Sequence, residues 1–201
     1  MRVRQLLAVV ALVLVIAQVL LVVVSWLLSV TLTDAVRSLI SSEGIRWFFG
    51  HFTENLCSPL LAWLLMLSVA WGCLVESRLA STLVHLRSRS LLFRQRVALR
   101  QCAILLVAYI VVIILLTAVP HAVLLSASGR LWPSAFSASI VPIVCFGTVM
   151  LSVAYALMAG VCRSLAEVFE LLVSGIRRAA PLFVIYILLI QFYESLCFVL
   201  L

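Results

Sequence analysis

The run LLAVVALVLVIAQVLLVVVSWLLSVTL (residues 6–32) decides what kind of fold this chain adopts. It holds no charged residue and is longer than the roughly 20 residues that a helix needs to cross the hydrocarbon core of a bilayer. A backbone in lipid must satisfy its own hydrogen bonds, so such a run predicts a transmembrane helix. Arg2 and Arg4 precede it, but its apolar part is too long for a signal peptide and no small-residue cleavage site follows. We therefore expect this span to be retained.

The rest of the chain has the same apolar character. Its 201 residues are 66% hydrophobic and 10% charged, and the mean hydropathy is +1.32. A soluble domain is nearer half apolar and a quarter charged, and could not bury this much apolar surface. The composition predicts an all-α integral membrane protein that forms a single transmembrane domain over residues 1–201. We expect about five spans, at about 6–32, 59–75, 102–125, 136–161 and 181–201.

The distribution of arginine predicts the orientation. All fourteen basic residues are Arg, and eleven of them precede span one or lie between spans two and three or four and five. The remaining three, Arg37, Arg46 and Arg130, fall on the opposite side. Because cytoplasmic loops of membrane proteins carry the excess of basic residues, this predicts a cytoplasmic N-terminus. The net charge of +7 is then a topology signal and does not indicate a nucleic-acid partner.

The stretch SLISSEGIRWFFGHFTENLCSPL (residues 38–60) separates spans one and two. Thr33 or Asp34 is suited to cap one helix, and Ser41 or Ser42 is suited to cap a second. Apolar residues recur there at roughly helical spacing, and Trp and Phe suit the boundary between lipid and water. We expect a pair of short amphipathic helices that lie in the membrane interface on the outer side.

Two further segments lie on the side predicted to be cytoplasmic. ESRLASTLVHLRSRSLLFRQRVALR (residues 76–100) is amphipathic and basic, which predicts a loop helix that touches anionic headgroups or, alternatively, a regulatory or partner-binding arm. Ser164 and Glu167 form the Ser-x-x-Glu pattern of a capping box, so a helix should begin there and run toward Gly175. We expect it to be separate from the last span, which starts near Pro181.

Few polar groups lie inside the expected spans, and an ionisable residue at membrane depth is a functional candidate. Gln191 and Glu194 in span five are the candidate substrate-binding residues. No nucleophile elbow, zinc-protease motif or phosphate-binding glycine loop occurs, so we expect neither catalysis nor a cofactor. The six cysteines lack C-x-x-C spacing, which favours packing residues over a disulfide framework or a metal site.

Two stretches resemble the AbgT family, the bacterial p-aminobenzoyl-glutamate transporters. The first combines SLISSEGIRWFF with PLLAWLLMLSVAWGCLVESRL, and the second is SVAYALMAGVCRSLAEVFELLVSGIRRAAPLFVIYILLIQFYESLCF. The matching residues of the first stretch are Ser38, Leu39, Glu43, Gly44, Arg46, Trp47, Gly72, Val75, Glu76, Ser77 and Leu79. Those of the second are Tyr155, Gly160, Arg163, Ser164, Glu167, Val168, Gln191 and Phe192.

The resemblance implies ion-coupled transport of p-aminobenzoyl-glutamate or a related folate-type anion across a bacterial cytoplasmic (inner) membrane. Family members also carry a re-entrant hairpin, which would fall between Leu79 and Arg96, and a second half with its own hairpin. This sequence has no counterpart of either. The missing half would then come from a second copy of the chain in a homodimer or from a partner chain. The alternative is a non-transporting accessory or degenerate relative, because five helices with few buried polar groups offer little to orient an anionic cargo.

Overall fold

The computed structural model of the chain is all-helical over the residues that it describes, which are 2–31, 36–85, 93–118 and 135–200. Five of its helices are long and apolar enough to cross a membrane, which confirms the predicted fold class. The contacts divide the chain into two compact units, residues 1–62 with 179–201 and residues 63–178. The helices are α1 (Arg2–Thr31), α2 (Ser42–Gly50), α3 (Phe52–Leu56), α4 (Pro59–Glu76), α5 (Leu79–His85), α6 (Phe93–Ala118), α7 (Ala135–Ala159) and α8 (Leu165–Leu200).

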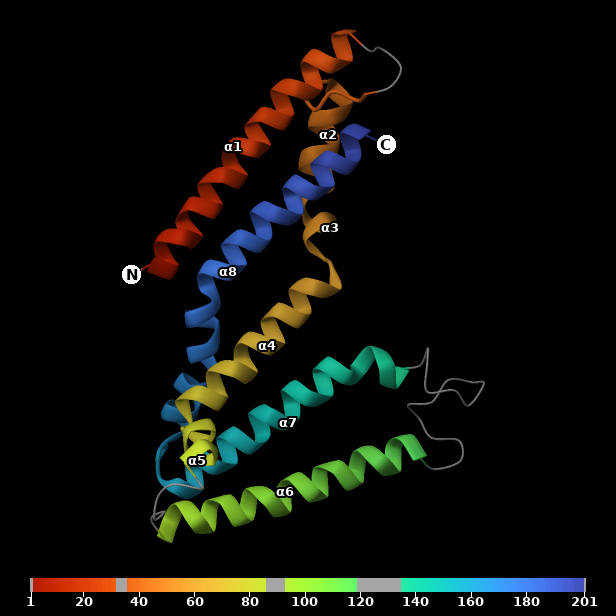
Figure 1. Cartoon of the computed structure of the whole chain (residues 1–201). Coiled ribbons are helices and arrows are strands. Elements are labelled where there is room, and N and C mark those ends of the chain that lie inside the picture. Colours follow the sequence, from red (N-terminus) through yellow and green to blue (C-terminus); the bar gives the residue numbers. More distant parts are fainter. Residues whose placement is uncertain (1, 32–35, 86–92, 119–134, 201) are drawn as a thin grey trace. The chain divides into compact units, whose positions relative to one another are not determined.

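The first unit is built around α1 and the last part of α8, which lie side by side and run in the same direction (Figure 1). Gln18 of α1 donates a hydrogen bond to the Ser195 hydroxyl of α8, at 3.0 Å. Beyond the end of α1, the Arg37 backbone N–H donates to the carbonyl of Val199, at 3.3 Å. A chain that crosses a membrane five times has its first and fifth spans parallel, so this packing agrees with the five-span topology.

Two short helices, α2 and α3, lie between α1 and α4. The predicted helix that begins at Ser41 or Ser42 is present as α2, whereas α3 was not predicted. The expected cap at Ser41 is confirmed, because its hydroxyl accepts from the Gly44 N–H at 3.0 Å. The prediction of a helix that starts at Thr33 or Asp34 is wrong, because residues 36–41, which it would include, form no helix. Thr33 and Asp34 themselves lie outside the described residues. In this non-helical segment, the Leu39 N–H donates a hydrogen bond to the Ser25 hydroxyl of α1.

The second unit holds the end of α4, then α5, α6 and α7, and the first part of α8. The antiparallel pair α6 and α7 is seen in Figure 1, and the Cys102 thiol of α6 contacts the Leu151 carbonyl of α7. Small residues line the contacts between these helices. The core clusters are Cys73, Ala156, Cys162 and Leu171, and Leu79, Ala98, Cys102 and Tyr155. Membrane helices approach closely where such small side chains meet.

The closest approach in this unit is between α4 and α8, at Gly72 and Gly175. A Cβ atom added to either glycine would overlap backbone atoms of the other helix. The Cys73 thiol donates to the Leu171 carbonyl beside this crossing, at 3.7 Å. Gly175 therefore serves as a contact point inside α8 rather than as the end of a helix.

The expected break between Gly175 and Pro181 is wrong, because α8 is one continuous helix of 36 residues. At a rise of 1.5 Å per residue it is about 54 Å long, which exceeds a hydrocarbon core of roughly 30 Å. Pro181 removes one helical N–H, and membrane helices tolerate such a loss. Its charged first part, up to Arg178, therefore extends beyond the predicted span five.

The helix of the third expected span, α6, begins at Phe93 and not near residue 102 as expected. The end of the basic segment 76–100 is therefore continuous with this span. Arginine side chains can reach headgroups from such an extension while their stems stay on apolar surface. The expected end of this span near residue 125 lies outside the described residues. The predicted orientation, with a cytoplasmic N-terminus, stays a prediction.

Candidate functional site

Gln191 lies midway between Pro181 and Leu200, so it is about 15 Å from either end of the apolar part of α8. Its side chain is buried, with 6% of its surface exposed. Neither its amide nitrogen nor its amide oxygen has a hydrogen-bond partner within the described part of the protein. The sequence-predicted candidate is therefore an enclosed polar group at mid-membrane depth.

A second amide lies at a similar depth in the first unit. Gln18 is midway along α1, and its side-chain nitrogen donates to the Ser195 hydroxyl. Ser195 is fully buried and lies one helical turn from Gln191, on the same face of α8. The amide oxygen of Gln18 is enclosed and accepts no hydrogen bond from the described residues. We call Gln18, Gln191 and Ser195 the mid-membrane polar cluster.

The second predicted residue, Glu194, is less enclosed than Gln191. It is half-buried, one turn along α8 from Gln191, and takes part in none of the ion pairs that the described residues form. Residues three apart lie on neighbouring positions of a helix surface. The structure thus places Glu194 at the edge of the mid-membrane polar cluster, beside the buried side chains of Gln191 and Ser195 on α8.

The energetic cost of this arrangement is what makes it a functional candidate. A buried donor or acceptor without a partner loses its hydration without compensation, which costs about 1–3 kcal/mol per group. Three amide atoms of the cluster are in this condition. Amides offer both a donor and an acceptor, so the cluster can bind a group that carries both, such as a carboxylic acid or another amide.

Sequence reasoning missed Gln18 and Ser195. The one strongly polar residue in the apolar run 6–32 is Gln18, and that isolation was the available signal. What the sequence could not supply was the register between α1 and α8, which brings Gln18 to Ser195.

Several residues that carry the AbgT resemblance stabilise helix contacts or a helix start. Gly44 packs on the backbone of Ser38 and Leu39, and Gly72 packs on Gly175. One of the two bonds of the predicted capping box is confirmed: the Ser164 hydroxyl accepts from the Glu167 N–H at 3.2 Å. The Glu167 carboxylate accepts from the Arg163 N–H at 2.7 Å, one residue before the Ser164 N–H that the pattern predicts. Gln191 is the matched residue that lies in the mid-membrane polar cluster.

The cysteines also lie where helices pack. Cys73, Cys102, Cys145 and Cys162 are buried, Cys197 is half-buried and Cys57 is exposed. No group of three or more His, Cys, Asp or Glu side chains in the described part is placed to hold a metal ion.

Comparisons of the chain with protein-family models, with curated proteins and with solved structures gave no match.

Proposed function

We propose that this chain is a membrane transport protein similar to the AbgT family, which carries p-aminobenzoyl-glutamate or a related folate-type anion. The observation that carries the proposal is the enclosed, unpartnered amide of Gln191 at mid-membrane depth. An orphaned polar group in an apolar helix costs stability, and such groups in membrane spans mark substrate and ion pathways. Gln191 is also one of the residues matched in the resemblance.

The chemistry of the cluster suits such a cargo. The amide nitrogen of Gln191 can donate to a carboxylate, and its oxygen can accept from an N–H of the cargo's own amide or aniline group. Glu194, at the edge of the cluster, is the group that we assign to the coupling ion or proton. The proposal places the protein in a bacterial cytoplasmic membrane, with its N-terminus inside.

A transport path needs more polar surface than one copy of the chain supplies. In many transporters, discontinuous helices supply ligands near the bilayer midplane. The five long helices described here are unbroken, and the sequence has no counterpart of the family's hairpins. We therefore propose that the working unit is a homodimer or a complex with a partner chain.

A second function is favoured by a different observation, namely that several of the matched residues have structural roles. Gly72, Ser164 and Glu167 stabilise a helix crossing and a helix start within the second unit. A chain that keeps such scaffold residues without the hairpins would be a non-transporting accessory protein, or a degenerate relative, of the same family.

The test is uptake of labelled p-aminobenzoyl-glutamate into liposomes that contain only this purified chain. Transport predicts flux that saturates with cargo concentration. Gln191→Leu should reduce this flux at least tenfold, because a site that hydrogen-bonds its cargo discriminates strongly against loss of the bond. Glu194→Gln should abolish the dependence on an ion or proton gradient.

Gln101→Leu is the matched control, since Gln101 is an exposed glutamine of α6. It should leave flux unchanged at equal protein content. The accessory function would be favoured if the protein is folded as helices and inserted in one orientation, yet gives no flux above that of empty liposomes. Co-purification of a partner from the native membrane would then be the next measurement.

A further inference from the structure

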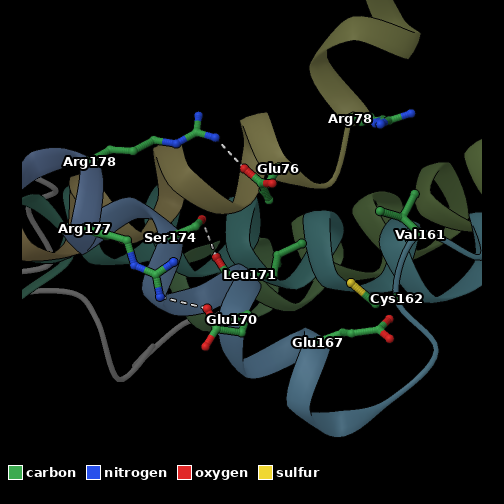
Figure 2. A pocket seen from close by; sticks show the side chains of 10 residues that line it. All are labelled: Glu76, Arg78, Val161, Cys162, Glu167, Glu170, Leu171, Ser174, Arg177 and Arg178. Carbon is green, nitrogen blue, oxygen red and sulfur yellow. Dashed lines mark hydrogen bonds and ion pairs between the residues drawn. The ribbon is translucent and has the colours of Figure 1, made fainter.

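A cleft of about 430 Å³ lies in the second unit. It is formed by the end of α4, the turn that follows, the link from α7 to α8, and the first part of α8. Figure 2 shows its lining side chains, which carry both signs of charge in equal number. The charged ones are Glu76, Arg78, Glu167, Glu170, Arg177 and Arg178.

Two ion pairs lie along this cleft. The Arg177 guanidinium bonds to the Glu170 carboxylate at 2.8 Å, and the Arg178 guanidinium bonds to the carboxylate of Glu76. In Figure 2 both pairs are drawn with dashed lines, and Arg78 lies apart from them. The four paired side chains are between 48% and 67% exposed. Such exposed pairs stabilise a protein by about 0–1 kcal/mol, so a better partner can replace either member.

Arg78 adds a cation that is not committed to an ion pair among the described residues. Its backbone adopts a φ of 61°, the left-handed region that non-glycine residues seldom occupy. The turn is held by hydrogen bonds, because the Arg78 carbonyl accepts from the N–H of Thr82 at 3.0 Å and from its hydroxyl at 2.9 Å. The Arg78 Cα is thereby fixed at the mouth of the cleft, directly after α4.

The cleft lies at the depth of lipid headgroups. The apolar run of α4 ends at Glu76, and the apolar part of α8 begins only after Arg178. Charged side chains at these two helix ends mark the boundary between hydrocarbon and water. This boundary is on the arginine-rich side of the protein.

We propose that this cleft binds the headgroup of a zwitterionic phospholipid with a primary ammonium, of the phosphoethanolamine type. Guanidinium groups bind phosphate by paired, charge-assisted hydrogen bonds, and Arg78, Arg177 and Arg178 supply them. Glu76 and Glu170 accept hydrogen bonds from the ammonium. A headgroup without an ammonium brings no cation for Glu76 and Glu170 when their arginine partners turn to the phosphate, and a trimethylammonium group has no N–H to donate.

The experiment is native mass spectrometry of the full-length chain with phosphatidylethanolamine, phosphatidylglycerol and phosphatidylcholine of identical acyl chains, in equal amounts. The wild-type chain should retain phosphatidylethanolamine at least fivefold over either competitor. The double variant Glu76→Gln with Glu170→Gln should lose this preference, with about tenfold weaker retention, because charge-assisted hydrogen bonds are removed. Glu43→Gln, which removes an exposed carboxylate of the first unit, should leave it intact.

A charge-swapped variant, Glu76→Arg with Arg178→Glu, guards against loss of folding. It keeps both charges in the cleft, so it should fold and retain the lipid preference. Equal retention of the three lipids by the wild-type chain, or a preference for phosphatidylglycerol, would overturn the proposal. Free phosphoethanolamine that binds as tightly as the lipid would overturn the lipid as the natural occupant.

Discussion

Both units of this protein contain hydrogen bonds between helices, including that of Tyr155 with Thr82 in the second unit, but they differ in the other contacts that join their helices. In the second unit, small side chains let helices touch, as at Gly72 and Gly175, and the buried residues are mostly apolar. In the first unit, several contacts are polar: Gln18 with Ser195, and the Ser58 hydroxyl with that of Tyr186 at 2.7 Å. Membrane helices use both close packing and interhelical hydrogen bonds.

The difference indicates where function resides. Among the described residues, the second unit has one buried side-chain polar atom without a hydrogen-bond partner, the Ser152 hydroxyl, whereas Gln18 and Gln191 of the first unit contribute three such atoms. The helix contacts of the second unit are mainly structural, and the transport function that we propose depends on the buried amides of the first unit. Substitutions in the two units should therefore change the unfolding free energy by different amounts and in different directions.

The largest effect is expected for Gly175→Leu. The side chain would overlap backbone atoms of Ser68 and Gly72, which cannot move without separating α4 from α8. Overpacking a core typically lowers the unfolding free energy by 1–3 kcal/mol. Because the obstructing atoms here belong to the backbone, we expect a loss of about 3 kcal/mol. An SDS unfolding titration measures it. Gly50→Ala is the control, because a Cβ there meets nothing within 4 Å and should not reduce stability.

A smaller loss is expected for Tyr155→Phe in the same unit. Tyr155 is buried, and its hydroxyl lies 2.8 Å from that of Thr82, which itself donates to the Arg78 carbonyl. Tyr155 is therefore the donor in this bond, and its removal should cost about 1–2 kcal/mol. A double-mutant cycle with Thr82→Val should show coupling of about 1 kcal/mol. Additive effects would contradict the bond.

Gln191→Leu should act in the opposite direction on stability. It removes an amide whose two polar atoms are buried without partners, so the unfolding free energy should rise by about 1 kcal/mol while transport falls. Ser195→Ala should lower the unfolding free energy by about 1 kcal/mol, because it leaves the Gln18 amide unpaired. A loss of stability in Gln191→Leu as large as that in Gly175→Leu would make Gln191 a structural residue.

Much of the fold could be predicted from the sequence because apolar run length is a strong signal. The start of α4 at Pro59, the cap at Ser41 and the capping box at Ser164 were all readable from local residue types. The continuity of α8 was not, because Gly175 and Pro181 signal a helix end in a local reading. The close approach of the Ser68 and Gly72 backbone explains why a glycine lies at position 175.

The candidate site was only half predictable. A polar residue inside an apolar run, such as Gln191, can be found by inspection, but its burial and its lack of a partner depend on neighbouring helices. The same holds for the charged cleft, where Glu76 and Arg178 come from distant parts of the sequence. Pairing between helices is a tertiary property, and a helix's own pattern does not determine it.

The smallest expected effect concerns Cys162, which lies in the link between α7 and α8 and lines the charged cleft. Burial raises the pKa of this thiol above its usual value of 9.0, and the carboxylates of Glu167 and Glu76 raise the pKa further. Since the thiolate is the reactive form, Cys162 should react slowly with a methanethiosulfonate reagent at pH 8.

Glu167→Gln removes one of these charges and should raise the reaction rate of Cys162 at pH 8 roughly twofold. Glutamine can still serve in the capping box, so the helix start should be kept. Because the folded thiol has the raised pKa, the unfolded chain loses its proton first as pH rises through about 9, and stability should fall there. An unchanged rate in Glu167→Gln, measured with Cys162 as the one remaining cysteine, would mean that the carboxylate does not act on the thiol. Water would then screen the charges of the cleft at Glu76 and Arg178 more strongly than its ion pairs imply. The contrast between a structural second unit and a polar first unit would weaken.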